Sequence, residues 1–408
     1  MLKAYKYRIY PNQEQQVKLA CTFGCVRYVY NWGLALKTKS YALGTKLSCF
    51  ETINQMKWLK EQEEYKWLNE VHSQPLQMAL RNLDNAYTKF FKKTGGFPKF
   101  KSKKSKQSFQ YPQGVQIDFE NDKIFLPKVG RIGCIFHRKF EGIVKTCTVS
   151  KNPCGSYYVS ILVEVKEEIP RKVKINNENQ AVGIDLGIKS FAVLSSNIEI
   201  ANPKHLKSKA IRLAVKQGQL SRKVKGSSNR NKSRIEVAKV HEKIANCRKD
   251  FHHQLSKAII DKYDLICLED LNVKGMVKNH KLAKAISDCG WSRFNSYLEY
   301  KAEWYGKYIA RLGRFQATSQ PCLNCGVSNK SVKNLSIREW TCPSCGHHNL
   351  RDLTASKNIK TFGLIQVGFK ELEPTINKSL WSGQPLVKSV LDFAKLELGI
   401  REASTLLG

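Results

Sequence analysis

Three carboxylates stand at the ends of short apolar segments, where an ionised side chain is costly unless a cation compensates it. Asp185 lies in Ala-Val-Gly-Ile-Asp-Leu-Gly-Ile-Lys-Ser-Phe-Ala-Val-Leu (181–194), between two segments typical of buried strands. Glu269 lies near the end of another short apolar strand, 261–271, and Asp352 opens a segment typical of a helix start. Two Mg²⁺ ions that cleave a phosphodiester need such hard oxygen ligands on rigid elements. The pattern predicts a two-metal site, although an isolated Asp-x-Gly is also a common turn cap.

Four of the thirteen cysteines form two matched pairs, and each pair is followed by a glycine. The pairs are Cys322 with Cys325 and Cys342 with Cys345. This spacing is typical of a structural four-cysteine Zn²⁺ site, in which the glycines permit the tight turns that aim both thiolates at one ion. Because the pairs lie between Glu269 and Asp352, the zinc-binding segment is expected to fold Asp352 back toward the other carboxylates.

The chain is strongly basic, with 69 Lys and Arg against 34 Asp and Glu and a formal net charge of +35 over 408 residues. So large an excess indicates a polyanionic partner such as DNA or RNA. The start of the chain lacks an apolar signal core, and no uncharged apolar stretch approaches eighteen residues. We therefore expect no membrane segment and a cytoplasmic protein, in which the nine remaining cysteines are reduced thiols.

The first 175 residues predict a small antiparallel barrel interrupted by helices. A strand at 3–10 precedes a helix that is capped by Asn12 and Gln15, and further helices are expected over about 50–68 and from Pro75. Short alternating strands over 108–169 then complete the barrel. From Lys89 to Lys106, where the last helix ends and these strands begin, eight lysines and no acid alternate with four phenylalanines, a mixture suited to phosphates and stacked bases. The lysines expected to contact nucleic acid are Lys92, Lys93, Lys99, Lys101, Lys103 and Lys104.

Residues 204–257 hold sixteen Lys or Arg against three acids, and apolar residues recur there every seven positions from Val237 to Ala258. With a Gly-Ser-Ser-Asn break at 226–229, this pattern predicts a helical hairpin over 204–260 whose outside binds phosphates. The candidate contacts are Arg222, Lys223, Arg230 and Arg234. Residues 292–312 are expected to form one long helix.

Taken together, these residues resemble TnpB, the RNA-guided nuclease family of small insertion-sequence transposons, related to type V CRISPR effectors. The resemblance covers about residues 1–362. The matching stretches are Tyr-Arg-Ile-Tyr-Pro-Asn at 7–12, residues 77–91, Gly-Phe-Pro-Lys-Phe at 96–100, Gly-Ile-Asp-Leu-Gly-Ile-Lys at 183–189, Ile-Cys-Leu-Glu-Asp-Leu at 266–271, Ser-Asp-Cys-Gly-Trp at 287–291, Thr-Ser-Gln-Pro-Cys at 318–322, and Arg-Asp at 351–352 followed by Ala355 and Asn358-Ile359.

The resemblance implies an α+β multidomain fold. Its parts would be a wedge β-barrel (1–10 and 101–175), a helical recognition lobe (11–100), a RuvC-type, RNase H-like nuclease domain (181–317 and 350–364), an inserted zinc ribbon (318–349) and a tail (365–408) that is partly disordered or a loosely attached helix. Asp185, Glu269 and Asp352 would bind two Mg²⁺ ions. The partners would be a transposon-derived guide RNA and double-stranded target DNA at the prokaryotic nucleoid. No protein oligomer is implied.

Two family features differ in detail. Gln77 matches a position that reads the short DNA motif beside the target, but its neighbours do not, so the motif itself does not transfer. Where the family usually has His-Asp-Arg-Asp, this chain has Asn349-Leu350-Arg351-Asp352, and Thr354 and Ser356 replace a usual Asn and Ala. The acidic ligand is kept while its surroundings change.

Three other functions fit parts of the sequence. An RNA-guided repressor with a disabled centre would share the fold, but the retained carboxylates favour an active nuclease. An actin-like ATPase also uses Asp-x-Gly, yet it needs a second phosphate loop and a glycine-rich adenosine site, and the sequence has neither. A transposase that acts without RNA would need a nucleophilic Tyr or Ser motif, and none stands out.

Overall fold

The computed structural model describes residues 1–369 and 386–388. The chain divides into two compact units, Met1–Glu168 and Ile169–Gly408, each with its own sheet and helices. The fold is therefore mixed α+β. Within the described ranges, no helix combines the length and the apolar composition needed to cross a bilayer.

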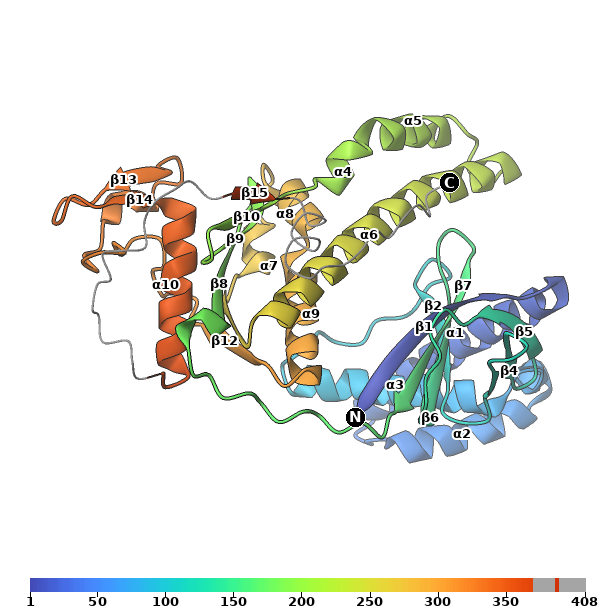
Figure 1. Ribbon diagram of the computed structural model, residues 1–408. Helices are drawn as coiled ribbons and strands as arrows, with labels where there is room; N and C mark the ends of the chain where they lie inside the picture. The colour runs from blue at the N-terminus through green and yellow to red at the C-terminus, as the bar shows by residue number, and fades with distance from the viewer. Residues whose placement is uncertain (370–385, 389–408) are drawn as a thin grey trace. The chain divides into compact units, whose positions relative to one another are not determined.

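A seven-stranded antiparallel sheet forms the first unit's framework (Figure 1). Its strands are β1 (Leu2–Tyr10), β2 (Gln107–Tyr111), β3 (Gln116–Asp118), β4 (Lys123–Leu126), β5 (Gly130–Ile135), β6 (Ile143–Lys151) and β7 (Tyr157–Glu164), in the order β2-β6-β7-β1-β5-β4-β3. The predicted strand at the start of the chain thus lies at the centre, paired with β5 and β7. No backbone ladder in the described part of the chain joins β2 to β3, so closure into a barrel stays a prediction.

The helices of this unit are α1 (Gln13–Ala42), α2 (Cys49–Glu61), the 3₁₀ helix η1 (Glu63–Asn69) and α3 (Ser73–Phe91). Asn12 caps α1 as predicted, because its side chain accepts from the Gln15 amide while the Gln15 side chain accepts from the Asn12 amide. Helices and sheet share one apolar core, in which Leu19 and Phe23 of α1 are buried with Phe109 of β2.

The second unit contains a six-stranded mixed sheet. Its strands are β8 (Ala181–Leu186), β9 (Ser190–Leu194), β10 (Ile198–Ala201), β11 (Leu265–Glu269), β12 (Tyr308–Leu312) and β15 (Leu386–Lys388), in the order β12-β11-β8-β9-β10-β15. β9 is antiparallel to β8, whereas β11 is parallel to β8 and β12 is parallel to β11. The carboxyl ends of β8 and β11 therefore meet at one edge of the sheet.

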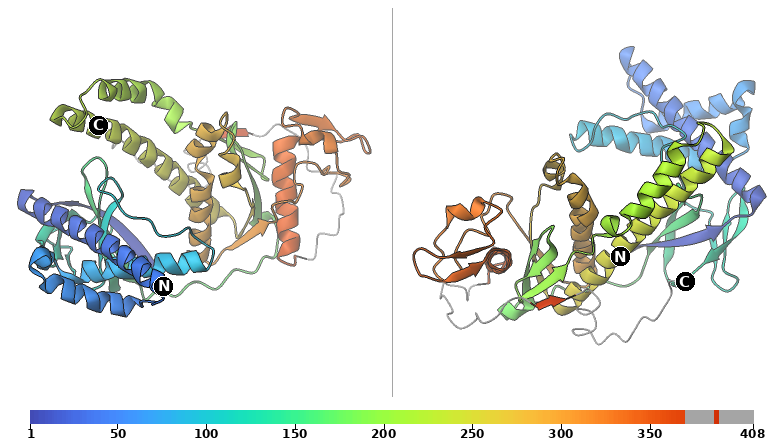
Figure 2. Two further views of the ribbon diagram at one scale, coloured as in Figure 1. Left: turned by 180° about the vertical axis from the view of Figure 1, so that it is seen from behind. Right: turned by 90° about the horizontal axis from the view of Figure 1, so that it is seen from above.

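Helices cover both faces of this sheet, as the views in Figures 1 and 2 agree. Residues of α6 (Ser228–Lys262) and α9 (Trp291–Trp304) pack on one face, and α10 (Arg351–Gln366) packs on the other. The remaining elements are η2 (Glu178–Gln180), α4 (His205–Ser208), α5 (Ala210–Ser221), α7 (Val273–Met276), α8 (Ala283–Cys289), η3 (Lys330–Lys333), β13 (Glu339–Thr341) and β14 (His348–Leu350). α5 packs along α6 through Leu213, Val240 and Ile244, in the stretch predicted to form a basic helical hairpin.

The prediction of one long helix over 292–312 was wrong. α9 ends at Trp304, and β12 then adds a strand beside β11. Gly306 separates the two elements with a φ of 63°, a left-handed conformation that ends a helix and that side chains disfavour. The predicted tail, 365–408, lies mostly outside the described residues. Only its first residues, which end α10, and the β15 strand are described.

Close backbone packing joins α10 to β8 and β11. A Cβ atom on Gly183 of β8 would lie 2.0 Å from the Ser356 carbonyl oxygen and 2.5 Å from the Lys360 amide nitrogen. A Cβ atom on Gly363 of α10 would lie 2.2 Å from the Cys267 sulfur on β11. One glycine in the sheet and one in the helix thus let the helix rest directly on both strands.

The substitution Gly183→Ala is expected to force α10 away from the sheet, because the new methyl group would meet main-chain atoms that cannot rotate away. We expect a loss of about 3 kcal/mol or more in the free energy of unfolding, measured by chemical denaturation. Gly133→Ala is the matched control, since this strand glycine has no atom within 4 Å of its built Cβ. Equal effects of the two substitutions would contradict the packing argument.

Candidate active site

Strand alternation places Asp185 and Glu269 on the same face of the sheet. Side chains two residues apart on a strand share a face. Val182 and Ile184 of β8 pack with α6 and α9, so Asp185 lies on the opposite face, toward α10. Glu269 of β11 also lies on the α10 face, because the preceding residue, Leu268, packs with α6 and α9 on the other face. Leu268 pairs with Ile184 in register, and the two carboxylates follow this pair at the end of adjacent parallel strands.

Asp352 reaches the same edge from the first turn of α10. It lies four residues before Ser356, whose carbonyl meets Gly183 of β8. Residues four apart share one face of a helix, so Asp352 lies one turn beyond the contact, toward the end of β8 where Asp185 stands. The structure therefore brings the three predicted carboxylates to one edge of the sheet.

The electrostatics of Asp185 show that the three groups interact. The pKa of Asp185 is raised well above its ordinary value, first by burial and then by the negative charges of Glu269 and Asp352. The Arg351 and Arg338 guanidinium groups oppose this shift. Burial also raises the pKa of Glu269, against a hydrogen bond from Thr318 that lowers it. Such a cluster of like charges favours binding of a proton or a cation.

Two neighbouring side chains hold the outer carboxylates. The buried Thr318 hydroxyl donates to Glu269 Oε1, and Asn358 of α10 donates to the Thr318 carbonyl oxygen at 2.7 Å. Arg338 Nη1 donates to both oxygens of Asp352, at 3.1 and 3.3 Å. The sequence shows Thr318 and Asn358 only as parts of stretches that match the family and does not single out Arg338, because the roles of all three depend on contacts between segments that are distant in the chain.

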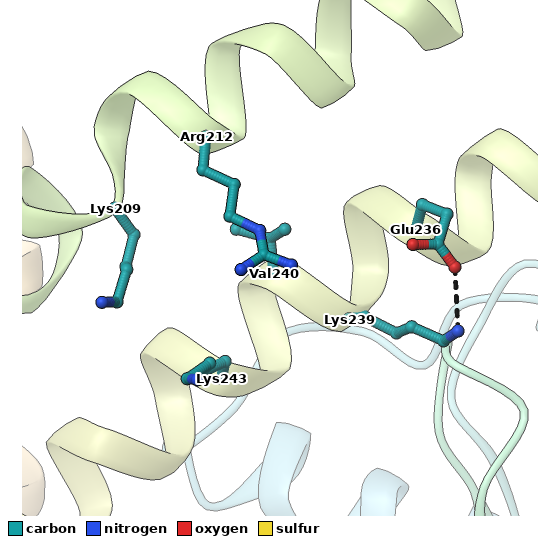
Figure 3. Close-up of a pocket in the computed structure, with 6 residues that line it drawn as sticks. All are labelled: Lys209, Arg212, Glu236, Lys239, Val240 and Lys243. Atoms are coloured by element: carbon teal, nitrogen blue, oxygen red, sulfur yellow. Dashed lines mark hydrogen bonds and ion pairs between the residues drawn. The ribbon is translucent and has the colours of Figure 1, made fainter. Parts of the chain in front are cut away.

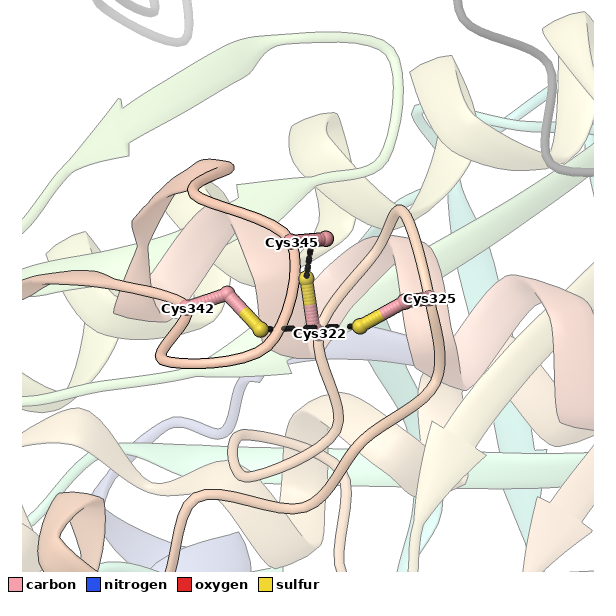
Figure 4. A group of neighbouring side chains, drawn as sticks. All are labelled: Cys322, Cys325, Cys342 and Cys345. Atoms are coloured by element: carbon pink, nitrogen blue, oxygen red, sulfur yellow. Dashed lines mark hydrogen bonds between the residues drawn. The ribbon is translucent and has the colours of Figure 1, made fainter.

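The four predicted cysteines form a compact cluster (Figure 4). Their sulfur atoms all lie within 4.8 Å of one another, with Cys322 and Cys345 at 3.7 Å and Cys325 and Cys342 at 3.5 Å. Tetrahedral Zn²⁺–thiolate bonds place sulfurs about 3.8 Å apart, so the donor set fits a structural zinc ion. In the described part of the chain, the oxygen atoms of Asp185, Glu269 and Asp352 do not lie as close to one another as these four sulfur atoms do.

The two halves of the cysteine cluster are equivalent turns. The Gly326 amide donates to the Cys322 carbonyl and the Gly346 amide to the Cys342 carbonyl, each at 3.0 Å. Both glycines have positive φ, 73° and 72°, as the glycine after each pair predicted. The turns carry a short hairpin, β13 with β14, that leads directly into α10.

Asn349, one of the departures from the family pattern, has a structural role. Its side chain is fully buried, accepts from the Leu323 amide at 3.2 Å, and donates to the His347 carbonyl and the Cys322 sulfur. It ties the first cysteine turn to the strand that precedes Asp352. A hydrogen bond to a sulfur that binds a metal helps to fix the orientation of that ligand.

The predicted nucleic-acid contacts differ in their environments. Gln77 is half-buried on α3, while the exposed ones are Lys92, Lys93, Lys99, Lys103, Lys104, Arg222, Lys223 and Arg234. Lys101 instead places its ammonium 3.7 Å from the centre of the Tyr30 ring. Arg230 donates to the carbonyls of Leu220 and Lys223, at 2.9 and 2.8 Å, and so closes the turn between α5 and α6. These two side chains have local structural partners.

A basic cleft of about 160 Å³ lies between α5 and α6 (Figure 3). Lys209, which precedes α5, and Arg212 of α5 line one side of the cleft, and Lys239 and Lys243 of α6 line the other. Glu236, the acid at this cleft, is paired with Lys239. The sequence predicts a basic hairpin but does not single out these residues, because the cleft exists only where the two helices pack together.

Family models match three parts of the chain. Residues 160–280 match a model described as a probable transposase, residues 1–46 a helix-turn-helix domain, and residues 291–359 a Cas12f1-like TNB domain. A protein of Streptomyces pristinaespiralis named "Putative RNA-guided DNA endonuclease" is 40% identical over 367 residues, which is 89% of each chain. The chain belongs to the TnpB family.

Two further proteins give the extent of the similarity. InsQ of Escherichia coli strain K12, with the same name in its description, is 32% identical over 94% of this chain and 96% of its own. A solved complex of Cas12f1 with its single guide RNA and target DNA aligns with 88% of this chain and 98% of that one, at 15% identity and a TM-score of 0.47. The identity to the two bacterial relatives, 40% and 32%, confirms the resemblance to TnpB in the sequence.

Replacing Asp185 by Asn is expected to stabilise the magnesium-free protein at pH 8. The pKa of Asp185 is raised in the folded state, so folding free energy is lost as the pH rises from the ordinary pKa of an unfolded Asp toward this raised pKa, and the loss is complete above it. Asn removes the charge, and we expect a gain of about 1–3 kcal/mol. The gain should vanish near pH 4, where the folded protein already carries a protonated Asp185. Thermal unfolding followed by circular dichroism measures the midpoints of the variant and of the unsubstituted protein at each pH.

The exposed carboxylate Asp250 on α6 supplies the control for this experiment. Asp250→Asn should leave the midpoint nearly unchanged at both pH values, because surface substitutions have small effects. A lower midpoint for Asp185→Asn than for the unsubstituted protein at pH 8 would contradict the electrostatic argument.

Removing one cysteine of the cluster should release its metal. We expect about one zinc ion per chain in the purified protein by elemental analysis, and a clear loss of zinc in Cys345→Ser, with a thermal midpoint lower by roughly 5 °C or more. Cys247→Ser, at a half-buried cysteine of α6 outside the cluster, should keep its zinc. Full zinc retention by Cys345→Ser would refute the assignment.

Proposed function

We propose that this protein is the RNA-guided, Mg²⁺-dependent DNA endonuclease of a transposon, and that it cleaves double-stranded DNA beside a short motif where a guide RNA pairs with the target. The observation that carries the proposal is the convergence of Asp185, Glu269 and Asp352 at one edge of the second unit's sheet. Membership of the TnpB family and relatives named as RNA-guided DNA endonucleases support it.

The strand order supports an RNase H-like, RuvC-type nuclease domain in the second unit. An antiparallel hairpin of β8 and β9 continues into parallel β11 and β12, with the carboxylates at the junction. We propose 181–317 and 350–364 for this domain, with the basic hairpin 204–260 and a zinc ribbon at 318–349. In the first unit, we propose a wedge β-barrel (1–10 and 101–175) and a helical recognition lobe (11–100).

The carboxylates provide a donor set that suits Mg²⁺. Asp185, Glu269 and Asp352 would hold two ions, and the bound ions would supply an activated water and charge stabilisation for the leaving 3′ oxygen. Thr318 fixes the orientation of Glu269 through its hydroxyl. Arg338 forms an ion pair with Asp352, so a magnesium ion would have to compete with this guanidinium group for the carboxylate.

Nucleic acid would be held by charge and shape rather than by sequence readout from the protein. Guide pairing supplies the sequence specificity in this class of enzyme. The basic cleft between α5 and α6 and the exposed lysines around α3 offer phosphate contacts. Gln77 on α3 is the proposed contact to the DNA motif. Such an enzyme would work in the prokaryotic cytoplasm, at the nucleoid.

The decisive test uses the ribonucleoprotein purified with its own RNA and a duplex that matches the guide. Cleavage is expected with Mg²⁺ and not with EDTA, and Asp185→Ala should lower the cleavage rate by about a thousandfold or more while DNA binding persists. Asp250→Asn should cleave at the normal rate. Matched DNA that is bound but never cut by the unsubstituted protein would favour an RNA-guided repressor, for which Asp185→Ala should also change nothing in cells.

A further inference from the structure

An aromatic pocket lies in the first unit, whereas the residues assigned above to metal binding belong to the second. It encloses about 580 Å³ between the last turns of α1, the loop that follows α1, the second half of α3 and Phe97. Sites for small organic ligands typically enclose about 300–1,000 Å³. The pocket is therefore large enough for a nucleotide.

Four aromatic rings in the wall contact one another. Tyr87 stacks on Phe91 with ring centres 6.3 Å apart, and Phe97 meets Tyr87 and Phe90 edge to face at 5.7 and 5.4 Å. These contacts hold the rings in fixed orientations. Even so, Phe91 is 70% exposed and Phe97 is 49% exposed, and Tyr41 on the opposite wall is 68% exposed. Exposed aromatic surface in a concave site is a binding surface.

The charge around the pocket is positive. Lys37 and Lys46 belong to its lining, and the lysine-rich segment that starts at Lys89 continues from α3 with eight lysines and no acid up to residue 106. The single acid in the lining, Asp84, is bound to Lys37 at 2.8 Å. Lys37 also lies 5.7 Å from the centre of the Tyr87 ring. Aromatic faces beside Lys46 and the lysine-rich segment match a base attached to its phosphate.

We infer that this pocket binds an unpaired nucleotide of the guide RNA, with its base against Phe91 and Phe97 and its phosphate toward the lysines. A paired base cannot enter, because both of its faces are already stacked. The guide RNA is favoured over target DNA since it is the resident partner, and a pocket with so much exposed apolar surface would promote aggregation if it were empty between targets. The inference rests on the proposed function.

The test measures RNA binding by nuclease-inactive protein, so that it does not depend on cleavage. In the Asp185→Ala background, the RNA recovered from the purified ribonucleoprotein is end-labelled and titrated with RNA-free protein. The double substitution Phe91→Ala with Phe97→Ala should raise Kd about five- to a hundredfold, which corresponds to the loss of one base stack. Phe91→Trp, which keeps a stacking face, should bind nearly as the parent does.

Trp58→Ala is the matched control, because Trp58 is 72% exposed on α2 and does not line the pocket. It should leave Kd unchanged. Thermal midpoints of all variants show whether they are folded. Irradiation of the ribonucleoprotein at 254 nm, followed by mass spectrometry, should give an RNA adduct on the peptide that contains Phe91 or Phe97 without added DNA.

The outcomes separate the two proposals. Unchanged RNA affinity in the folded double variant overturns the pocket assignment alone, and so does an adduct that forms only with target DNA and carries DNA. If the parent protein retains no RNA at all, the proposed function fails and the pocket assignment fails with it. A weakened double variant, a normal Trp58→Ala protein and an RNA adduct together support the nucleotide pocket.

Discussion

Direct backbone contact between α10 and β8 is the constraint on which the candidate site depends. Gly183 has no side chain, so the helix approaches the strand until the Ser356 carbonyl occupies the place of a Cβ atom. Asp185 lies two residues further along the strand, and Asp352 lies one turn earlier on the helix. Their proximity follows from this contact and from the regular geometry of a strand and a helix.

The same contact gives the site its electrostatic character. Burial raises the pKa of Asp185 most, and the repulsion between its charge and those of Glu269 and Asp352 raises it further. The protein offsets part of this repulsion with local partners, a hydroxyl at Glu269 and a guanidinium at Asp352. Both partners lie on the segment that contains the cysteine turns or leads into it, so this segment positions two of the three carboxylates.

Much of the site could be predicted because its signals are local in the sequence. An acid at the end of an apolar strand is conspicuous at Asp185 and Glu269, and the cysteine spacing indicates one four-thiolate ion without further knowledge. Strand periodicity also suffices to place both acids on one face once the register is known. The order of the strands and the side of the sheet that α10 covers became clear only from the structure.

Other predictions failed or remained incomplete for identifiable reasons. The aromatic residues over 292–312 fit a helical period. The helix nevertheless ends before Gly306, and the residues that follow form a strand that pairs with β11. Charge counting also cannot tell a solvated cation from one with a local partner, as Lys101 and Arg230 show. The cleft lined by Lys209 and Lys243 arises from the packing of two helices, which the number of charges along the sequence does not reveal.

The position of α10 in the chain has a consequence for biosynthesis. Strands β8 and β11 and both cysteine pairs precede Asp352, so a nascent polypeptide emerging from the ribosome holds two of the acids and the zinc-binding turns well before the third acid arrives. A truncated translation product that stops before residue 351 would have neither this acid nor the helix that covers Gly183. Under the proposed function, cleavage would therefore require a chain that has been translated past α10.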